Sequence, residues 1–225
     1  MKNRLTIALA TGVLCACVVS ACASSGAAGT AGAGDSAGAA NTMPTPAPGA
    51  TPSEAGDTLV AAGYGTLRQD DITVSLRSGA VLVKVTPLTE SVIRLTAPDT
   101  YNRLTSLRMS RSEEASQMTM GEPELVLVSF FSYEPDASFQ PEDLQIVYQS
   151  RLLRPSLIIP LTGGWGRQRL DQQETQTAIY GFDTSIDFGQ VMTVRYGMQE
   201  SEQWRQTIVR LENERAQIRS RIRQP

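Results

Sequence analysis

Short apolar segments separated by turn residues recur through the middle of the chain and predict a β-rich domain. Residues 72–77 alternate between apolar and polar side chains, as in a strand with one buried face, and Ser78-Gly79 then turns the chain. Residues 125–131 are apolar almost throughout, which is typical of a central strand. About eight such segments favour an antiparallel β-sandwich over residues 57–200. The other expected strands cover 80–85, 144–148, 151–154, 157–159, 177–182 and 191–196.

One segment within this region has a different period. Residues 88–108 carry Val92, Ile93, Leu95, Leu104 and Leu107 at roughly helical spacing. A proline and an aspartate at 98–99 stand where a second helix would begin, and proline suits the first helical position. We therefore expect a short helical insertion, of one or two helices, that caps an open end of the sandwich.

The last 25 residues, 201–225, predict an amphipathic, basic C-terminal helix with Ser201 as its N-cap. Its apolar residues follow one another at spacings of 4, 3, 7 and 4, and an arginine occupies the missing position of this heptad seam. The helix could bind an envelope protein, form a homo-oligomer or lie on an anionic lipid surface. The candidate partner-binding residues are Trp204, Ile208, Leu211, Ile218 and Ile222, with Arg215 and Arg219.

Charge divides unevenly between the two regions. Residues 57–200 contain 12 basic and 18 acidic residues, whereas residues 201–225 contain 6 basic and 3 acidic ones. Five apolar residues over three heptads with a central arginine make a weak coiled coil, which favours a helix that folds back onto the acidic domain as part of its core. The chain as a whole has a net charge of −3, which gives no indication of nucleic-acid binding.

The beginning of the chain carries a targeting signal. Lys2 and Arg4 precede an apolar segment, residues 5–19, that is too short to span a membrane comfortably. The run Val19-Ser20-Ala21-Cys22 that follows resembles the lipobox of bacterial lipoproteins. The resemblance implies a signal peptide over residues 1–21, lipidation of Cys22 and a membrane anchor in the bacterial cell envelope. Ala23 favours the outer membrane over the inner one; ordinary cleavage that leaves an unmodified Cys22 is the alternative.

Residues 22–56 predict a disordered tether. Beyond Cys22 this segment is rich in alanine, glycine and proline and has no leucine, isoleucine, valine or aromatic residue, so it cannot bury enough surface to offset the entropy of ordering. Its alanine content admits a helix as the alternative, but six interspersed glycines between Gly26 and Gly49 argue against one. Such a tether would let a domain stand away from its membrane.

Composition also excludes several kinds of chemistry. The chain has no histidine, and Cys22 is the last of its three cysteines. Ser-His-Asp and Cys-His nucleophiles, zinc sites with histidine ligands and disulfide staples are therefore excluded from the domain. We expect no catalytic residues, no metal and no cofactor, and we interpret the protein as a non-enzymatic binding or scaffolding module. Its architecture resembles immunoglobulin-like sandwiches in strand number and spacing, without their paired cysteines.

Acidic residues offer the strongest alternative to a binding role. Glu134, Asp136, Glu142 and Asp143 lie close together in sequence, and a pair of carboxylates is what a glycosidase needs. The alternative function is thus a carboxylate-dependent enzyme that acts on envelope glycans, although acidic loops of this kind usually lie in solvent. The pairs Asp70-Asp71 and Asp183/Asp187 offer oxygen ligands but lack the spacing of a calcium loop. We therefore expect Asp70-Asp71 to form a hairpin turn and Asp183 to end the preceding strand.

A glycine-rich segment, Gly163-Gly164-Trp165-Gly166-Arg167, offers one further partner-binding candidate. Trp165 beside an arginine could stack on a sugar or contact a protein partner. The competing interpretation is that the tryptophan covers one end of the sandwich while the glycines turn the chain around it. A third function, self-assembly of a structural lipoprotein through the C-terminal helix, also remains open at this point.

Overall fold

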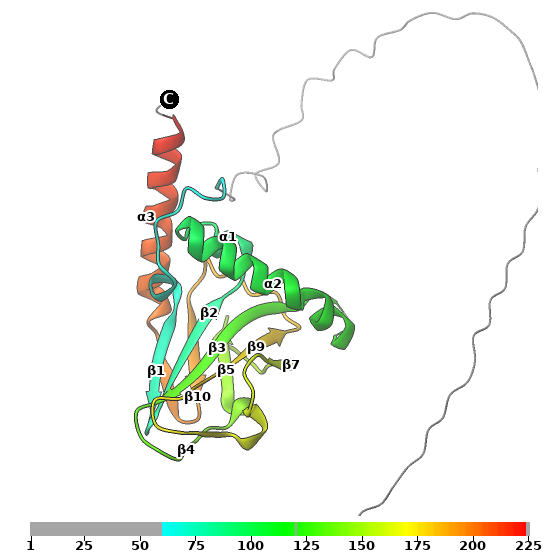
Figure 1. The fold of residues 1–225 in the computed structure, drawn as a ribbon. Helices are drawn as coiled ribbons and strands as arrows, with labels where there is room; N and C mark the ends of the chain where they lie inside the picture. Colours follow the sequence, from blue (N-terminus) through cyan, green and yellow to red (C-terminus); the bar gives the residue numbers. More distant parts are fainter. Residues whose placement is uncertain (1–59, 120, 224–225) are drawn as a thin grey trace, which may run out of the picture. The chain divides into compact units, whose positions relative to one another are not determined.

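The computed structural model describes residues 60–119 and 121–223, all of which lie in the compact unit Gly49–Pro225. The expected signal peptide, Cys22 and the expected tether lie outside the described residues. The described part of the chain has a mainly β fold with antiparallel sheets and three α-helices, as the sequence predicts (Figure 1). Within it, no helix is both long enough and apolar enough to cross a membrane.

The larger sheet has five strands in the order β1-β2-β3-β9-β7, and every neighbouring pair is antiparallel. β3 lies at its centre and is almost fully buried, which confirms the expectation drawn from its continuous apolar run. The first hairpin turns at Gly79-Ala80, one residue later than predicted, because Ser78 still pairs with Val81; Gly79 has a positive φ of 58° that glycine adopts without strain. The strands are β1 (Val74–Ser78), β2 (Val81–Pro87), β3 (Glu124–Ser132), β9 (Thr175–Phe182) and β7 (Leu157–Pro160).

The second sheet has four strands in the order β11-β10-β5-β6. Its β5–β6 hairpin turns at Gln149-Ser150, where both residues have positive φ, as a tight two-residue hairpin requires. The ring centroids of Phe130 in β3 and Tyr196 in β10 lie 5.5 Å apart, so the two sheets pack face to face. The strands are β11 (Gln199–Ser201), β10 (Met192–Tyr196), β5 (Leu144–Tyr148) and β6 (Arg151–Leu153); β4 (Ala137–Ser138) and β8 (Arg169–Leu170) form a separate pair.

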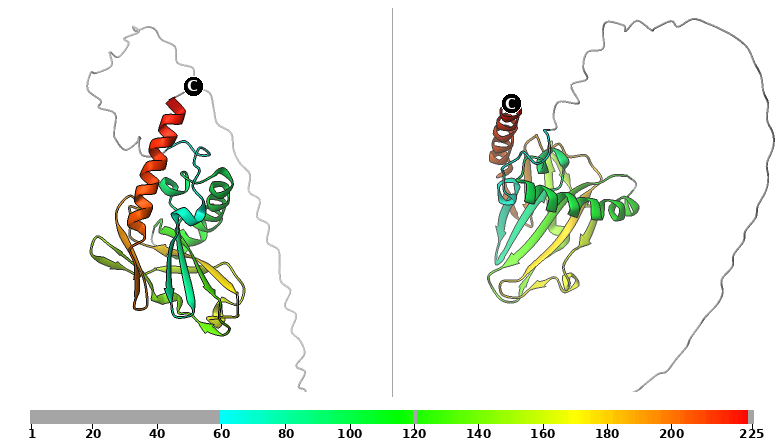
Figure 2. Two further views of the ribbon diagram at one scale, coloured as in Figure 1. Left: turned by 90° about the vertical axis from the view of Figure 1, so that its left-hand side faces the viewer. Right: turned by 45° about the horizontal axis from the view of Figure 1, so that its top comes forward.

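The helical insertion is present but longer than expected. α1 (Glu90–Ile93) and α2 (Pro98–Met118) connect β2 to β3, and α2 lies across one end of the larger sheet (Figure 2). α2 continues ten residues past Arg108. The apolar pattern stops at Arg108 because the last turns of the helix contact the body mainly through Ala115. Short 3-10 turns complete the fold: η2 (Gln69–Ile72), η3 (Pro141–Asp143) and η4 (Trp165–Arg167).

The C-terminal helix, α3 (Trp204–Arg223), starts three residues later than expected. Ser201 is not its N-cap, because this residue ends strand β11. Trp204 is fully buried, its indole Nε1 donates to the carbonyl of Phe188 at 3.2 Å, and the two rings meet edge to face. Together with Leu211 and Ile218 it joins the same hydrophobic core as the strands, so α3 packs against the sandwich.

Candidate ligand-binding cavity

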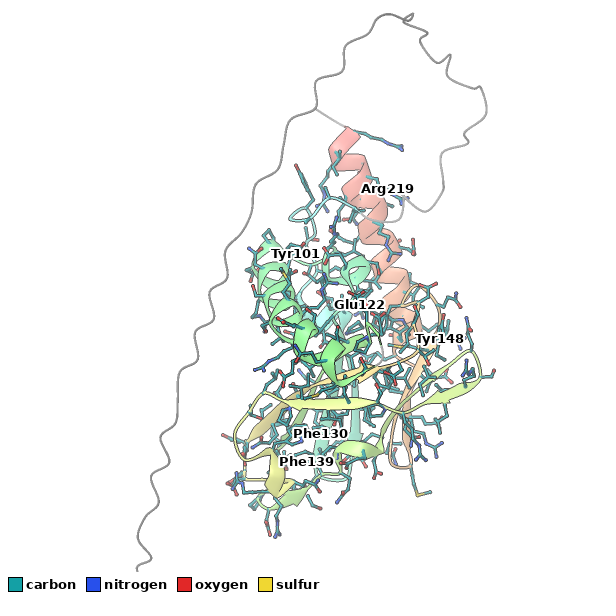
Figure 3. All side chains as sticks on the ribbon, turned by 90° about the vertical axis from the view of Figure 1, so that its right-hand side faces the viewer. Tyr101, Glu122, Phe130, Phe139, Tyr148 and Arg219 are labelled. Carbon is teal, nitrogen blue, oxygen red and sulfur yellow. The ribbon has the colours of Figure 1, made fainter. Side chains whose placement is uncertain are left out.

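A cavity of about 360 Å³ opens beside the C-terminal half of α2. Residues 88–90, after β2, and residues 122–125, at the start of β3, form one wall, and α2 residues between Arg108 and Ser116 form the other. Glu122 lies at its exposed rim. Figure 3 labels Glu122 and Tyr101 beside α2, whereas Phe130 and Phe139 lie at the other end of the sandwich. The cavity is thus separate from the aromatic end of the domain.

Small side chains on α2 create this space. Ser112, Ala115 and Ser116 are three and four residues apart, so they share one face of the helix. None of them reaches far enough to fill the gap between the helix backbone and Leu125 on the opposite wall. Since Leu88, Ala115 and Leu125 are buried, the inner part of the cavity is apolar.

Glu124 supplies a carboxylate to this partly apolar space. It is the first residue of β3, and its Oε1 accepts a hydrogen bond from the hydroxyl of Thr89. Burial raises the pKa of Glu124 above its ordinary value of 4.5, while the Thr89 hydroxyl and the nearby Arg108 guanidinium lower it by less. The carboxylate is therefore poorly solvated and would gain from a partner that carries charge or donates hydrogen bonds.

Glu90, the second carboxylate of the cavity, already has such partners. Its Oε1 accepts from Arg94 Nε at 2.6 Å and from the Tyr101 hydroxyl at 2.9 Å, and Arg108 Nη2 lies 3.0 Å from its Oε2. Two guanidinium groups and a phenol therefore surround one carboxylate. This cluster ties α1 to α2 and turns the Arg108 side chain toward Glu90.

The three carboxylates of the cavity differ in their partners. Glu90 is held by its three partners, whereas Glu124 lies in the wall with Thr89 as its hydrogen-bond donor and Glu122 lies at the exposed rim. The described residues also contain no group of three or more acidic or cysteine side chains that could hold a metal ion. What the cavity offers is an apolar inner wall with one poorly solvated carboxylate.

The carboxylates of the 134–143 loop lie elsewhere. Glu134, Asp136, Glu142 and Asp143 are all exposed, and the structure does not gather them around a cavity. Asp136 instead pairs with Arg169 at 2.6 Å across the β4–β8 ladder. The loop therefore lies in solvent, as the sequence favoured.

The other acidic candidates serve turns. Asp187 accepts from the backbone N–H of Gly189 at 2.8 Å, and Asp71 accepts from the backbone N–H of Arg68 at 2.8 Å. Asp70 pairs with Lys84 at 3.2 Å on the surface. Asp183 is exposed directly after β9. Asp183 thus follows the end of its strand, as expected. The prediction of a hairpin turn at Asp70-Asp71 is wrong, because both residues lie in η2, ahead of β1, and the hairpin turns between Ser78 and Val81.

Trp165 covers one end of the sandwich, as the second of the two interpretations of the glycine-rich segment predicts. It is partly buried, and its ring meets Phe139 and Phe130 edge to face at centroid distances of 5.2 and 5.8 Å. Gly164 turns the chain into η4 with a φ of 84°. The Trp165 side chain is still partly exposed, so a contact between Trp165 and a partner stays a prediction.

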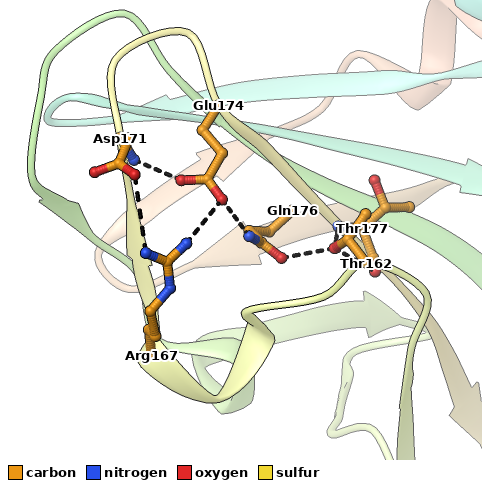
Figure 4. Close-up of polar contacts among 6 residues, drawn as sticks. All are labelled: Thr162, Arg167, Asp171, Glu174, Gln176 and Thr177. Carbon is orange, nitrogen blue, oxygen red and sulfur yellow. Dashed lines mark hydrogen bonds and ion pairs between the residues drawn. The ribbon is translucent and has the colours of Figure 1, made fainter.

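A polar network holds the loop that carries Trp165 (Figure 4). Glu174 accepts from the backbone N–H of Asp171 at 2.7 Å and from the amide of Gln176, and it pairs with Arg167 at 3.2 Å. The Thr162 hydroxyl in turn donates to the Gln176 side chain at 2.6 Å. The pKa of Glu174 is lowered, mainly by the Asp171 N–H and the Gln176 amide, because both stabilise the charged carboxylate.

The C-terminal helix buries a different stripe from the predicted one. Trp204, Leu211 and Ile218 are buried as expected, but the positions between them are filled by Thr207 and Glu214. The remaining candidates are less buried: Ile208 and Arg215 are partly buried, Arg219 is exposed, and Ile222 is half exposed. Arg215 Nη2 also donates to the Ser91 carbonyl at 3.3 Å. The stripe that packs on the domain is thus rotated relative to the heptad seam.

Comparison with known proteins finds no family model, no curated protein and no solved structure that matches this chain. The cavity residues Glu90, Arg108 and Glu124 were not among the sequence candidates. Glu124 stands at the start of an apolar strand, where a charged residue usually marks only the strand end. The burial of Glu124 depends on α2, which forms the opposite wall of the cavity. The local sequence pattern around Glu124 does not predict that α2 lies there.

Proposed function

We propose that this protein is a lipid-anchored lipoprotein of the bacterial envelope whose domain binds a small ligand in the cavity beside α2, without catalysis. The observation that carries the proposal is the cavity of about 360 Å³ with the carboxylate of Glu124 in its wall. Pockets of this size, with apolar walls and a few polar groups, are typical of small-molecule sites. The binding role agrees with a sequence that lacks histidine.

The anchor in this proposal rests on the sequence Val19-Ser20-Ala21-Cys22. A flexible tether of the length of residues 22–56 has a root-mean-square reach on the order of 30–35 Å, enough for a domain to stand clear of a membrane surface. Labelled palmitate tests the anchor, since incorporation should be lost in Cys22→Ser and retained in Cys17→Ser. Label that remains in Cys22→Ser would contradict it.

Binding in the cavity is tested by filling it. Ser112→Phe should fill the space between α2 and the start of β3, whereas Ser110→Phe places the same ring on the outer, exposed face of α2. Native mass spectrometry of the full-length protein, extracted gently from envelopes, should show a bound small molecule in wild type and in Ser110→Phe. The same species should be absent from Ser112→Phe. A bound species that persists in Ser112→Phe, or no bound species in any of the three proteins, would contradict the proposal.

The glycan-hydrolase alternative has less support. It needs two facing carboxylates, whereas the acids of the 134–143 loop are exposed and Asp136 pairs with Arg169. Self-assembly through α3 has less support as well, because Trp204, Leu211 and Ile218, three of the five apolar residues proposed for the contact, pack into the domain's own core. The binding role therefore stands as the proposed function.

A further inference from the structure

The arginines around the cavity beside α2 have carboxylate partners, whereas two of the cavity's carboxylates have no ion pair among the described residues. Arg94 and Arg108 both pair with Glu90, and Arg111 pairs with Glu114 at 2.8 Å, so the cations of this region are directed to other carboxylates. The ion pairs that the described residues form include neither Glu122 nor Glu124. The cavity therefore holds one inner carboxylate without an ion pair and a second one at its rim.

Glu124 is the carboxylate with most to gain from a ligand. It accepts a hydrogen bond from Thr89, but one hydroxyl replaces only part of the water that a carboxylate loses on burial. A positively charged group in the cavity would interact with Glu124 in surroundings that screen charge poorly, where attraction between opposite charges is stronger than in water. An anionic ligand would be repelled by Glu124 and Glu122, and Arg108, which pairs with Glu90, would compensate this repulsion little.

The rest of the cavity defines what the cation is attached to. Ala115 and Leu125 form its buried apolar wall, and Met109 lies at its mouth with 66% of its surface exposed. A short aliphatic chain would cover these surfaces, while its charged end reaches Glu124. Among organic cations, a primary ammonium also brings several N–H donors to a carboxylate with few hydrogen bonds.

We propose that the cavity beside α2 binds an aliphatic primary ammonium group, with Glu124 as its counter-ion and the Ala115–Leu125 wall as the contact surface for its chain. This inference rests on the proposed function and adds the chemical class of the ligand. The amine is either a free small molecule or the lysine side chain of a peptide, and both present the same group.

The test compares probes that share one backbone and an aliphatic side chain but differ in the charge at the end of that chain. N-acetyl-lysine methylamide carries the ammonium, N-acetyl-norleucine methylamide carries a shorter neutral chain, and N-acetyl-aminoadipate methylamide carries a carboxylate. Calorimetric titrations use the full-length protein in phosphatidylcholine nanodiscs, with empty nanodiscs as the blank. We expect the lysine probe to bind at least about tenfold more tightly than the norleucine probe, which corresponds to about 1.4 kcal/mol, and the aminoadipate probe to bind most weakly.

Two variants locate the preference. Glu124→Gln keeps the side-chain volume and should reduce binding of the lysine probe to that of the norleucine probe. Glu134→Gln changes an exposed residue of the distant 134–143 loop and should leave the preference unchanged. Binding of the lysine probe should also weaken as pH falls, because protonation of Glu124 removes its charge, and this pH dependence should disappear in Glu124→Gln.

A fourth probe, 5-aminopentanol, separates the two sources of the amine. Binding as tight as that of the lysine probe points to a free amine, and binding of the lysine probe alone points to a peptide. Tighter binding of the norleucine or aminoadipate probe, lost in Ser112→Phe, would overturn the cationic ligand while keeping the cavity as a binding site. No binding of any probe would overturn the cationic ligand as well, and the native mass spectra would then decide the proposed function by themselves.

Discussion

The carboxylate of Glu214 accepts a hydrogen bond from the backbone N–H of Thr66 at 3.0 Å, although 148 residues separate the two in sequence. The same oxygen accepts from the Thr66 hydroxyl at 3.0 Å and from Arg221 Nη2 at 3.3 Å. Arg221 Nη1 also donates to the Tyr64 carbonyl at 2.8 Å. The first described residues of the chain are thus fastened to α3, at the place where the expected tether would join the domain.

Replacing Glu214 by alanine should release this segment. The substitution leaves the Thr66 N–H without its acceptor and removes a buried partner of Arg221, so we expect a loss of about 1–3 kcal/mol in the free energy of unfolding. Urea denaturation measures the loss, and hydrogen exchange should show reduced protection at residues 65–67. Glu212→Ala is the matched control, because Glu212 is exposed on the same helix and pairs with its neighbour Arg215. Equal effects of the two variants would contradict a fastening role.

Gly65 is required where this segment passes the link between α1 and α2. A Cβ at this position would lie 2.2 Å from the Leu95 carbonyl carbon and 2.5 Å from the Thr96 oxygen, and both of these are backbone atoms. Gly65→Ala should therefore displace the segment and cost about 1–3 kcal/mol, as overpacking usually does. Gly166→Ala, where an added Cβ meets nothing within 4 Å, should change the denaturation midpoint little. A stable Gly65→Ala protein would show that the segment can shift at little cost.

Local sequence patterns predicted the strands well, because alternation and turn residues lie within or next to each strand. Strand β5 has the predicted bounds, 144–148, since alternation and a two-residue turn together define a hairpin. The first strand begins two residues later than predicted, because Ile72 ends a 3-10 turn in which the Thr73 hydroxyl donates to the Gln69 carbonyl at 2.7 Å. The sequence thus predicts the centre of a strand more reliably than the residue at which it begins.

The buried stripe of α3 and the cavity depend on contacts between distant residues. From the sequence, a glutamate at position 214 is expected to face solvent. Hydrogen bonds from Thr66 to its carboxylate allow Glu214 to be buried, with 4% of its surface exposed. The cavity likewise exists because serine and alanine face β3 from α2, which is a relationship between two elements. Periodicity along one segment contains no information on either contact.

The loop that carries Trp165 should loosen when Glu174 is replaced by alanine. This change removes the acceptor of the Asp171 N–H and the partner of Arg167 (Figure 4). We expect the indole of Trp165 to become more accessible, with a red-shifted emission and stronger quenching by acrylamide. Trp204 is fully buried and should contribute little to this change. Glu134→Ala provides the control on a neighbouring exposed loop, and a spectrum identical to wild type would show that the network does not hold the loop.

Two buried tyrosines should resist ionisation. The Tyr180 hydroxyl donates to the Pro141 carbonyl at 2.9 Å, and burial raises the pKa of Tyr180 far above its ordinary value of 10.0. Burial also raises the pKa of Tyr196, whose oxygen accepts from the Gln140 N–H at 2.8 Å. Each residue therefore stabilises the fold below the ordinary tyrosine pKa, and this contribution is lost as pH rises above it.

An alkaline spectrophotometric titration measures this resistance. Tyr180 and Tyr196 should ionise only as the protein unfolds. Tyr180→Phe should cost about 1 kcal/mol at neutral pH, because the Pro141 carbonyl loses its donor, and should remove one of the late-titrating groups. Ionisation of all six tyrosines in one step, before unfolding, would contradict the prediction.

Glu124 should make stability depend on pH in the opposite sense to a salt-bridged carboxylate. Because burial raises its pKa above 4.5, the folded state holds the proton more tightly than the unfolded state. Its contribution to stability is therefore fully present below the unfolded pKa and is lost as pH rises through the higher folded pKa. Glu124→Gln keeps the shape without the charge, so its melting temperature should exceed that of wild type at neutral pH and match it in acid.

Melting curves across this pH range, in the absence of any amine, test the prediction. Glu134→Gln is the control, since its exposed carboxylate should leave the difference from wild type small at every pH. An amine that occupies the cavity should reverse the order at neutral pH, because it stabilises wild type through Glu124 and has no counter-ion in Glu124→Gln. A wild-type protein that is more stable than Glu124→Gln at neutral pH without ligand would mean that Thr89 and Arg108 already compensate the buried charge. The cavity would then lack the unmet charge on which the ammonium site depends.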